Sequence, residues 1–280
     1  MRDPQLIALP YHNGLPDVGM GAGAALLAGD PALHAALWDA DWAPTVQRVP
    51  AADPAAGEIA RTFELLRALA LAVRSAVQRG AFPLVLAGGC LSAAGTVAGS
   101  GALGAVWLDA HADLDTPEDN LSGFLDVMAL SLLTGGCWAA QRATIPRFTR
   151  LAEADVALLG VRDLAPYQAE QVARAATRTA PGGYGPAAAA GAIAPLPVPL
   201  YLHVDLDVLD PSVGRANHYA APGGPTLATV LATVDAAFDH GRVAAAALTA
   251  YDPTADRDGR ILDASRTIAA RIALRAREQI

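Results

Sequence analysis

Two stretches of this sequence place metal-binding side chains at alternating positions beside apolar runs. The first is WLDAHADLD at residues 107–115, and the second is YLHVDLDVLDP at residues 201–211. In a β-strand, side chains two residues apart lie on the same face, so each stretch can direct its polar groups to one place. The carboxylate and imidazole groups at these positions are Asp109, His111, Asp113, Asp205 and Asp207.

These five groups have the chemistry of a site for divalent metal ions. Carboxylates together with a histidine suit Mn²⁺, Mg²⁺ or Zn²⁺. Two ions roughly 3.5–4 Å apart, bridged by carboxylates, need about this many protein ligands. The competing interpretation is that the aspartates begin helices or turns, which is a common role of Asp. Because the arrangement occurs in two separate strands, we favour a metal site.

The composition excludes several other classes of protein. The 280 residues are 53% hydrophobic with no linker rich in Pro, Gly or Ser, so we expect one domain spanning residues 1–280. The net charge of −8 argues against nucleic acid as a partner, because a phosphate-binding face needs clustered Lys and Arg. The two cysteines do not indicate a disulfide framework. We expect neither a signal peptide nor a membrane span, and therefore a cytoplasmic protein.

Apolar segments that alternate with helical patterns surround the two stretches. We expect strands at residues 6–10, 45–50, 82–90, 103–115, 154–163, 199–208 and 242–253. Apolar residues at helical spacing predict intervening helices, among them 55–80, 165–178, 226–241 and 258–280. The Gly-, Pro- and Ala-rich segment 180–199 is expected to be an exposed loop. Strands that are apolar throughout predict a parallel sheet covered on both faces, which binds ligands at the carboxyl ends of its strands.

The two stretches also belong to a longer series of motifs. A glycine pair at 88–89 precedes DAHAD at 109–113, and DLDVLDP at 205–211 precedes Pro-Gly-Gly at 222–224 and Tyr-Asp-Pro at 251–253. In this order the motifs resemble those of the arginase/agmatinase (ureohydrolase) family, over most of the chain. The resemblance implies an α/β fold of three α/β/α layers with a mostly parallel sheet of about eight strands. It also implies a homo-oligomer, either a trimer or a hexamer.

The resemblance implies a reaction and a role for each ligand as well. In that family two manganese ions activate a bridging water, which attacks a guanidinium carbon and releases urea. By this resemblance Asp109 and Asp205 would bridge both ions. His111 and Asp207 would complete one ion, and Asp113 would bind the other.

One metal ligand of the family is absent from this chain. In the family the glycine pair is followed by Asp-His-Ser, and the histidine binds the first metal; this chain has Cys90, Leu91 and Ser92 there. Leucine cannot bind a metal. Cys90 could do so if the loop shifted by one residue, since a thiolate is a better ligand for Zn²⁺ than for Mn²⁺; otherwise it is a small buried apolar residue. A single ion is therefore an alternative to two.

Histidines and one aspartate are candidates for proton transfer or for orienting the ligands. The family's shuttle histidine is replaced by Asp126, which could be a general acid if burial raised its pKa, or could instead face a helix dipole. His218, in a later loop, is either a second candidate or simply solvated. His203, two residues before Asp205, either orients a carboxylate or packs in the core. His12 ends the first strand and is a candidate for contact with the site.

The substrate-binding positions differ from the family as well. Ala250 stands where a glutamate usually pairs with the guanidinium, and Asp252 either replaces that glutamate or starts a turn. Asp115 and Phe124 stand where asparagine is usual, whereas Ser122 is retained. A carboxylate at Asp115 would repel an α-carboxylate and tolerate an amine, so arginine itself is not the expected substrate.

We therefore expect a metal-dependent hydrolase of non-peptide C–N bonds that acts on a guanidino or amidino compound, such as agmatine or a modified arginine. Two Mn²⁺ ions are expected, with Zn²⁺ as the alternative metal. The competing function is a catalytically impaired protein of the same fold that binds a metal or ligand, as the changes at Leu91, Asp126 and Ala250 suggest. The five retained ligands argue against it, because buried carboxylates without a metal repel one another.

Overall fold

The central sheet has eight strands, all parallel, in the order β4-β1-β5-β10-β9-β6-β7-β8. The structure, a computed structural model, describes residues 3–38 and 45–279. The strands of the sheet are β1 (Pro4–Leu9), β4 (Val46–Arg48), β5 (Phe82–Ala87), β6 (Gly104–Leu108), β7 (Val156–Leu159), β8 (Arg178–Ala180), β9 (Leu200–Asp205) and β10 (Val243–Thr249). A separate two-stranded ribbon pairs β2 (Tyr11–His12) with β3 (Leu15–Pro16).

The apolar strands are buried because helices cover both faces of the sheet. Every residue of β1, β5, β6, β7, β9 and β10 is buried. Such continuous apolar runs are typical of parallel strands covered on both sides. The α/β fold of three layers predicted from the sequence is confirmed, with eight parallel strands. That one domain spans residues 1–280 stays a prediction.

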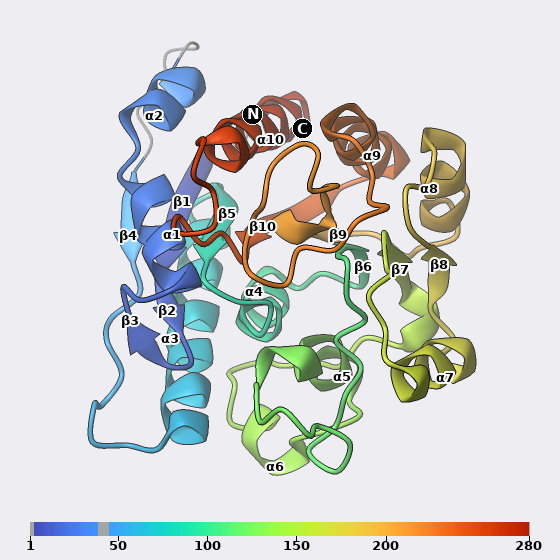
Figure 1. Ribbon diagram of the computed structural model, residues 1–280. Coiled ribbons are helices and arrows are strands. Elements are labelled where there is room, and N and C mark those ends of the chain that lie inside the picture. The colour runs from blue at the N-terminus through green and yellow to red at the C-terminus, as the bar shows by residue number, and fades with distance from the viewer. Residues whose placement is uncertain (1–2, 39–44, 280) are drawn as a thin grey trace.

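The helices form two layers, one on each face of the sheet (Figure 1). One layer packs on the core cluster that contains Leu6 and Leu202, and its helices are α1 (Met20–Ala28), α2 (Pro31–Trp38), α8 (Pro186–Ile193), α9 (Leu227–His240) and α10 (Arg260–Glu278). The other packs on the cluster that contains Val85 and Trp107, with α3 (Glu58–Gln78), α4 (Ser92–Ser100), α5 (Ala129–Thr134) and α7 (Pro166–Arg174). A short α6 (Ala139–Arg142) follows α5. None of the helices in the described part of the chain combines the length and apolar character that crossing a bilayer requires.

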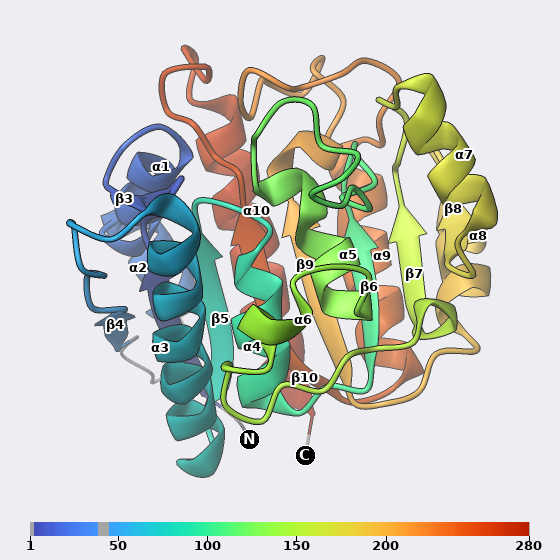
Figure 2. The same ribbon diagram turned by 90° about the horizontal axis from the view of Figure 1, so that it is seen from below.

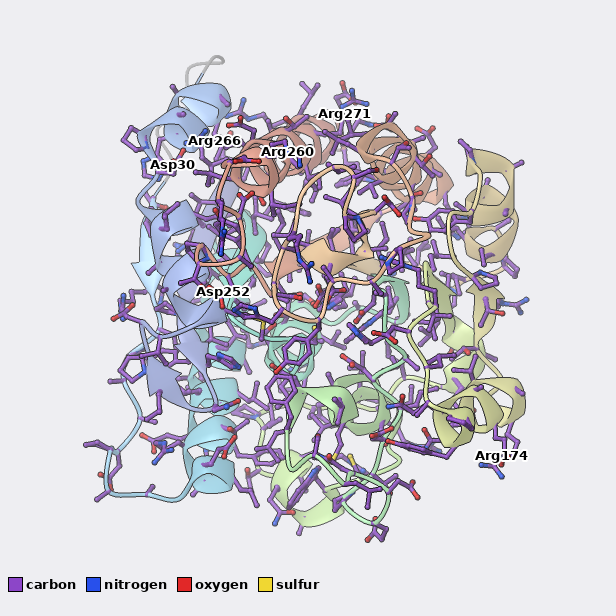
Figure 3. The ribbon with its side chains drawn as sticks, in the orientation of Figure 1. Asp30, Arg174, Asp252, Arg260, Arg266 and Arg271 are labelled. Carbon is purple, nitrogen blue, oxygen red and sulfur yellow. The ribbon has the colours of Figure 1, made fainter. Side chains whose placement is uncertain are left out.

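Two loops lie at one edge of the sheet, and an ion pair joins two of the helices that cover it. The loops that follow β6 and β9 both lie at the carboxyl edge of the sheet (Figure 2). Arg266 of α10 donates two hydrogen bonds to Asp30, at 2.9 and 2.6 Å (Figure 3). This bidentate, charge-assisted pair joins the last helix to the start of α2.

The sequence prediction was wrong for segment 180–199, which is not only an exposed loop. It contains the helix α8, whose Ala189 and Ile193 are buried in the core. Pro186 is at the first position of the helix, where its missing N–H costs nothing, so the Pro and Gly residues mark the ends of a helix rather than a loop. The helix expected at 165–178 also ends at Arg174, and β8 follows it as the short edge strand of the sheet.

Candidate metal centre and active site

The two ligand-bearing stretches leave the sheet at the ends of neighbouring strands, but of the five candidate ligands they carry only Asp205 is itself on a strand. β6 ends at Leu108 and pairs there with Val204 of β9, so Asp109 and Asp205 emerge side by side. Asp109, His111 and Asp113 therefore lie in the loop after β6, and a 3₁₀ turn at Leu206–Val208 carries Asp207. The prediction that strand alternation directs these side chains is wrong, because turn hydrogen bonds do so instead.

Local hydrogen bonds fix the first carboxylate of each stretch. Asp109 Oδ1 accepts the backbone N–H of His111 at 2.7 Å, and Oδ2 accepts the indole N–H of Trp107 at 3.0 Å. Asp205 Oδ1 accepts the N–H of Asp207 at 2.9 Å in the same way. Each first aspartate therefore closes a short turn that returns the chain toward the site.

The donor atoms gather in two groups that share Asp109. One contains Asp109, His111 and Asp207, and the other contains Cys90, Asp109, His203 and Asp205; within each group the donor atoms lie within 4.8 Å of one another. These side chains come from β9 and from the segments that follow β5, β6 and β9. Asp113 lies beside both groups and lines the same cavity.

The electrostatics of this cluster fit a bound cation. Burial and the neighbouring carboxylates raise the pKa of Asp113 well above its ordinary value, and its Oδ2 is buried without a hydrogen-bond partner. Burial also raises the pKa of Asp109 and Asp205. Burial disfavours protonation of His111, but the carboxylates of Asp207 and Asp109 outweigh it and raise the His111 pKa to about 11. A divalent cation would supply the positive charge that now has to come from protons.

Cys90 and His203 lie deeper than the other candidate ligands. The Cys90 thiol donates a hydrogen bond to Asp205 Oδ2 at 2.9 Å. His203 is fully buried, stacks on Trp107 at 3.7 Å between ring centroids, and has its Nδ1 2.8 Å from the hydroxyl of Tyr201. Burial lowers the pKa of His203 to about 3, so the imidazole is neutral.

A cavity of about 380 Å³ opens above the two groups. Asp126 forms part of its wall: Asp126 Oδ1 accepts the N–H of Leu91 at 3.0 Å, and burial raises the Asp126 pKa to about 6. Gly89 faces Asp126 so closely that a Cβ there would lie 1.9 Å from Asp126 Oδ2. Only glycine leaves room for this carboxylate beside the candidate metal ligands.

The far end of the cavity carries the predicted substrate-binding residues Asp115 and Ser122. Asp115 is buried, and its carboxylate accepts hydrogen bonds from the Tyr167 hydroxyl at 2.9 Å and from Gln168 Nε2 at 3.0 Å. Ser122 lies in an exposed turn, where it donates to Asn120. Phe124 and Tyr219 stack at 5.7 Å and form the apolar part of the wall.

Two predicted site residues lie elsewhere. Asp252 Oδ1 accepts from the N–H and the hydroxyl of Thr254 at 2.9 and 2.8 Å, which is the turn role considered as its alternative, and the residue lies toward α1 (Figure 3). His218 is largely exposed, and its Nε2 is 3.9 Å from Asp252 Oδ2. Among the described residues, neither His218 nor Asp252 lines the cavity, whereas Ala250 does. His12 makes an edge contact with Phe124, a residue of the cavity wall, at 5.6 Å between ring centroids.

Several residues of the site were missed in the sequence. Asn217 Nδ2 donates to Asp207 Oδ2 and to the carbonyl of Ala250, both at 3.0 Å, and so holds a ligand against the end of β10. Tyr167 and Gln168 reach Asp115 from the start of α7. All three are ordinary polar residues whose spacing carries no signal, so only the folded chain shows their partners.

The chain belongs to the arginase family, because the family model for arginases matches residues 24–277. Among curated relatives, the arginase of Brucella melitensis is 30% identical over 199 residues, which cover 64% of this chain and 63% of the relative. The arginase of Bacillus caldovelox is 40% identical over 100 residues, which cover 34% of this chain and 33% of the relative. The aligned segments therefore span less than two thirds of either relative.

Solved structures share the fold over nearly the whole chain. The Bacillus caldovelox arginase structure superposes with a TM-score of 0.81 at 24% identity and covers 98% of both chains. Proclavaminate amidino hydrolase from Streptomyces clavuligerus superposes with a TM-score of 0.70 at 17% identity, covering 98% of this chain and 92% of the other. At these identities the likeness concerns the fold. The family resemblance expected from DAHAD and the later motifs is confirmed.

Proposed function

We propose that this protein is a metal-dependent hydrolase of non-peptide C–N bonds in a guanidino or amidino compound. The observation that carries this proposal is the pair of ligand groups sharing Asp109 at the base of a cavity of about 380 Å³. When bound there, divalent ions would supply Lewis acidity and would activate water for attack on a guanidine or amidine carbon. We expect Mn²⁺ at the oxygen-rich group of Asp109, His111 and Asp207.

The chain's own residues would then position the substrate and move protons. Asp126, with a pKa of about 6, can hold a proton near neutral pH and donate it to a departing amine as a general acid. Asp115, held by Tyr167 and Gln168, offers a fixed negative charge at the far end of the cavity. This charge favours a substrate with a terminal amine, such as agmatine, over one with an α-carboxylate.

Ala250 lines the cavity and affects which kind of guanidine could bind there. With a methyl group there in place of a carboxylate, the cavity offers no ion pair at the end of β10 to an unsubstituted guanidinium. The proposed substrates therefore include a modified guanidine. The fold shared with a proclavaminate amidino hydrolase is consistent with such a substrate. The same change supports the second candidate, a binding protein of this fold without turnover.

The test is urea release by the full chain, purified without chelator and assayed after its metals are counted. Agmatine, arginine and hydroxylated guanidino compounds should be compared with added Mn²⁺. We expect urea from an amine-headed or modified guanidine, and we expect Asp207→Asn to lose both a bound ion and activity. Metal-loaded protein that releases no urea from any of these compounds would favour the binding protein. A cytoplasmic location and assembly as a trimer or hexamer stay predictions.

A further inference from the structure

The family's first-metal histidine has no counterpart at Leu91, but another imidazole lies where that ligand is needed. A ring nitrogen of His203 belongs to the same donor group as the Cys90 thiol and the carboxylates of Asp109 and Asp205, within 4.8 Å of each. All four residues are buried. The donors are a thiol, an imidazole and two carboxylates, which come from three neighbouring parts of the sheet. An ordinary cluster of acidic residues does not provide this mixture of sulfur, nitrogen and oxygen donors.

The His203 ring is held in the orientation of a ligand. Trp107 stacks on its face with an interplanar angle of 17°, and the Tyr201 hydroxyl binds its Nδ1 at 2.8 Å. The opposite nitrogen, Nε2, lies 3.4 Å from the Thr249 hydroxyl, which is itself 3.4 Å from Asp205 Oδ2 and 3.5 Å from Cys90 Sγ, so Nε2 is on the side of these donors. Metal-binding histidines are typically fixed in this way, through a hydrogen bond at the nitrogen that does not bind the metal.

Leu91 contacts Asp126 and the hydrophobic core instead of joining this donor group. Its backbone N–H donates to Asp126 Oδ1 at 3.0 Å, and its side chain packs against two core clusters. The preceding residue, Cys90, turns inward and donates its thiol hydrogen to Asp205 Oδ2 at 2.9 Å. The loop after β5 therefore presents sulfur, and β9 presents nitrogen.

We propose that Cys90, Asp109, His203 and Asp205 form a zinc site. In this site His203 supplies the imidazole ligand that the family has at the position of Leu91. Thiolate and imidazole ligands in a set of four select Zn²⁺, whereas the group of Asp109, His111 and Asp207 has mainly oxygen and suits Mn²⁺. On binding, the Cys90 thiol would release its proton to solvent, and its thiolate would hold the zinc without any change in oxidation state. This inference rests on the proposed metal centre. It assigns zinc to one donor group and manganese to the other.

The experiment equilibrates the full chain with equal concentrations of Zn²⁺ and Mn²⁺ and counts both metals per chain. We expect one zinc that resists a weak chelator. Loss of an outer hydrogen-bonding partner costs about 10–100-fold in metal affinity, so His203→Asn and Cys90→Ser, which remove direct ligands, should weaken zinc binding by at least about 100-fold. Cys137→Ser and His34→Asn are matched controls, since these residues lie outside both groups, and they should keep the zinc.

Cobalt substitution of the unaltered chain gives a readout that needs neither activity nor a folded variant. A thiolate-to-cobalt charge-transfer band is expected, and it should persist in Cys137→Ser. The proposal is overturned by the absence of this band, by a His203→Asn protein that keeps zinc with unchanged affinity, or by two manganese ions and no zinc. Zinc that behaves as expected in a protein releasing no urea would refute the proposed hydrolase and leave this site standing.

Discussion

Replacing Asp126 by asparagine should stabilise the metal-free protein at high pH and not at low pH. Burial raises the Asp126 pKa from 3.8 to about 6, and each pKa unit corresponds to about 1.4 kcal/mol. The ionised carboxylate therefore costs the folded state about 3 kcal/mol. Because Asp126 is partly exposed to the cavity, water screens some of this cost and the figure is an upper limit.

The sign of the pH dependence follows from the raised pKa. Well below pH 3.8 the carboxyl is protonated in both states and the variant should gain nothing. As the pH rises through 6, the folded wild type loses stability relative to its unfolded state, whereas an asparagine, which can still accept from the Leu91 N–H, does not. The stability difference should therefore grow from near zero to its full value at about pH 7.

Denaturant unfolding in chelator, at about pH 4.5 and pH 8, measures this difference. The exposed Asp258→Asn is the matched control and should show no such trend. A constant difference between Asp126→Asn and wild type across the two pH values would refute the burial argument. Under the proposed function the same variant should lose activity, so a more stable but inactive enzyme is expected at pH 8.

Three further outcomes are expected. Asn217→Ala leaves Asp207 Oδ2 and the Ala250 carbonyl without the side-chain amide that donates to them. It should lower the unfolding free energy by about 1–3 kcal/mol in denaturant titrations and the metal affinity by about 10–100-fold. Unchanged metal binding would show that Asp207 does not need this hydrogen bond. Asp115→Asn should reduce kcat/KM for an amine-headed guanidine relative to arginine, and an unaltered ratio would remove Asp115 from substrate selection. Chelator treatment should lower the Tm measured near pH 8 because the buried carboxylates are then uncompensated, and a Tm that does not move would argue against a bound cation.

The sequence contained enough to predict the sheet and the ligand cluster, for different reasons. Apolar strands separated by amphipathic helices predict a parallel sheet directly, and the ends of neighbouring strands then meet at one edge. Residue type and spacing selected the candidate ligands, although most of these residues lie in loops and turns and not on strands. The 3₁₀ turn at Leu206–Val208 depends on the Asp205 side chain accepting the N–H of Asp207, which alternation does not reveal.

Other parts of the site depend on contacts between distant segments. The position of His203 two residues before Asp205 left its role open, because only the fold brings Cys90, 115 residues from Asp205 in sequence, to the same place. Asp252 and Thr254 illustrate the reverse case, in which a local turn takes a carboxylate away from the cavity. Segment 180–199 was misassigned because Gly and Pro mark helix ends as well as loops.

Asp109 belongs to both donor groups, and this has a thermodynamic consequence. Whatever occupancy of one group does to the affinity of the other, the coupling free energy must be the same in both directions. Zinc that changed the manganese dissociation constant tenfold would have its own constant changed tenfold by manganese. The order in which the two metals are added would then alter the intermediate populations and not the final state, and titrations begun from either metal should close the same thermodynamic cycle.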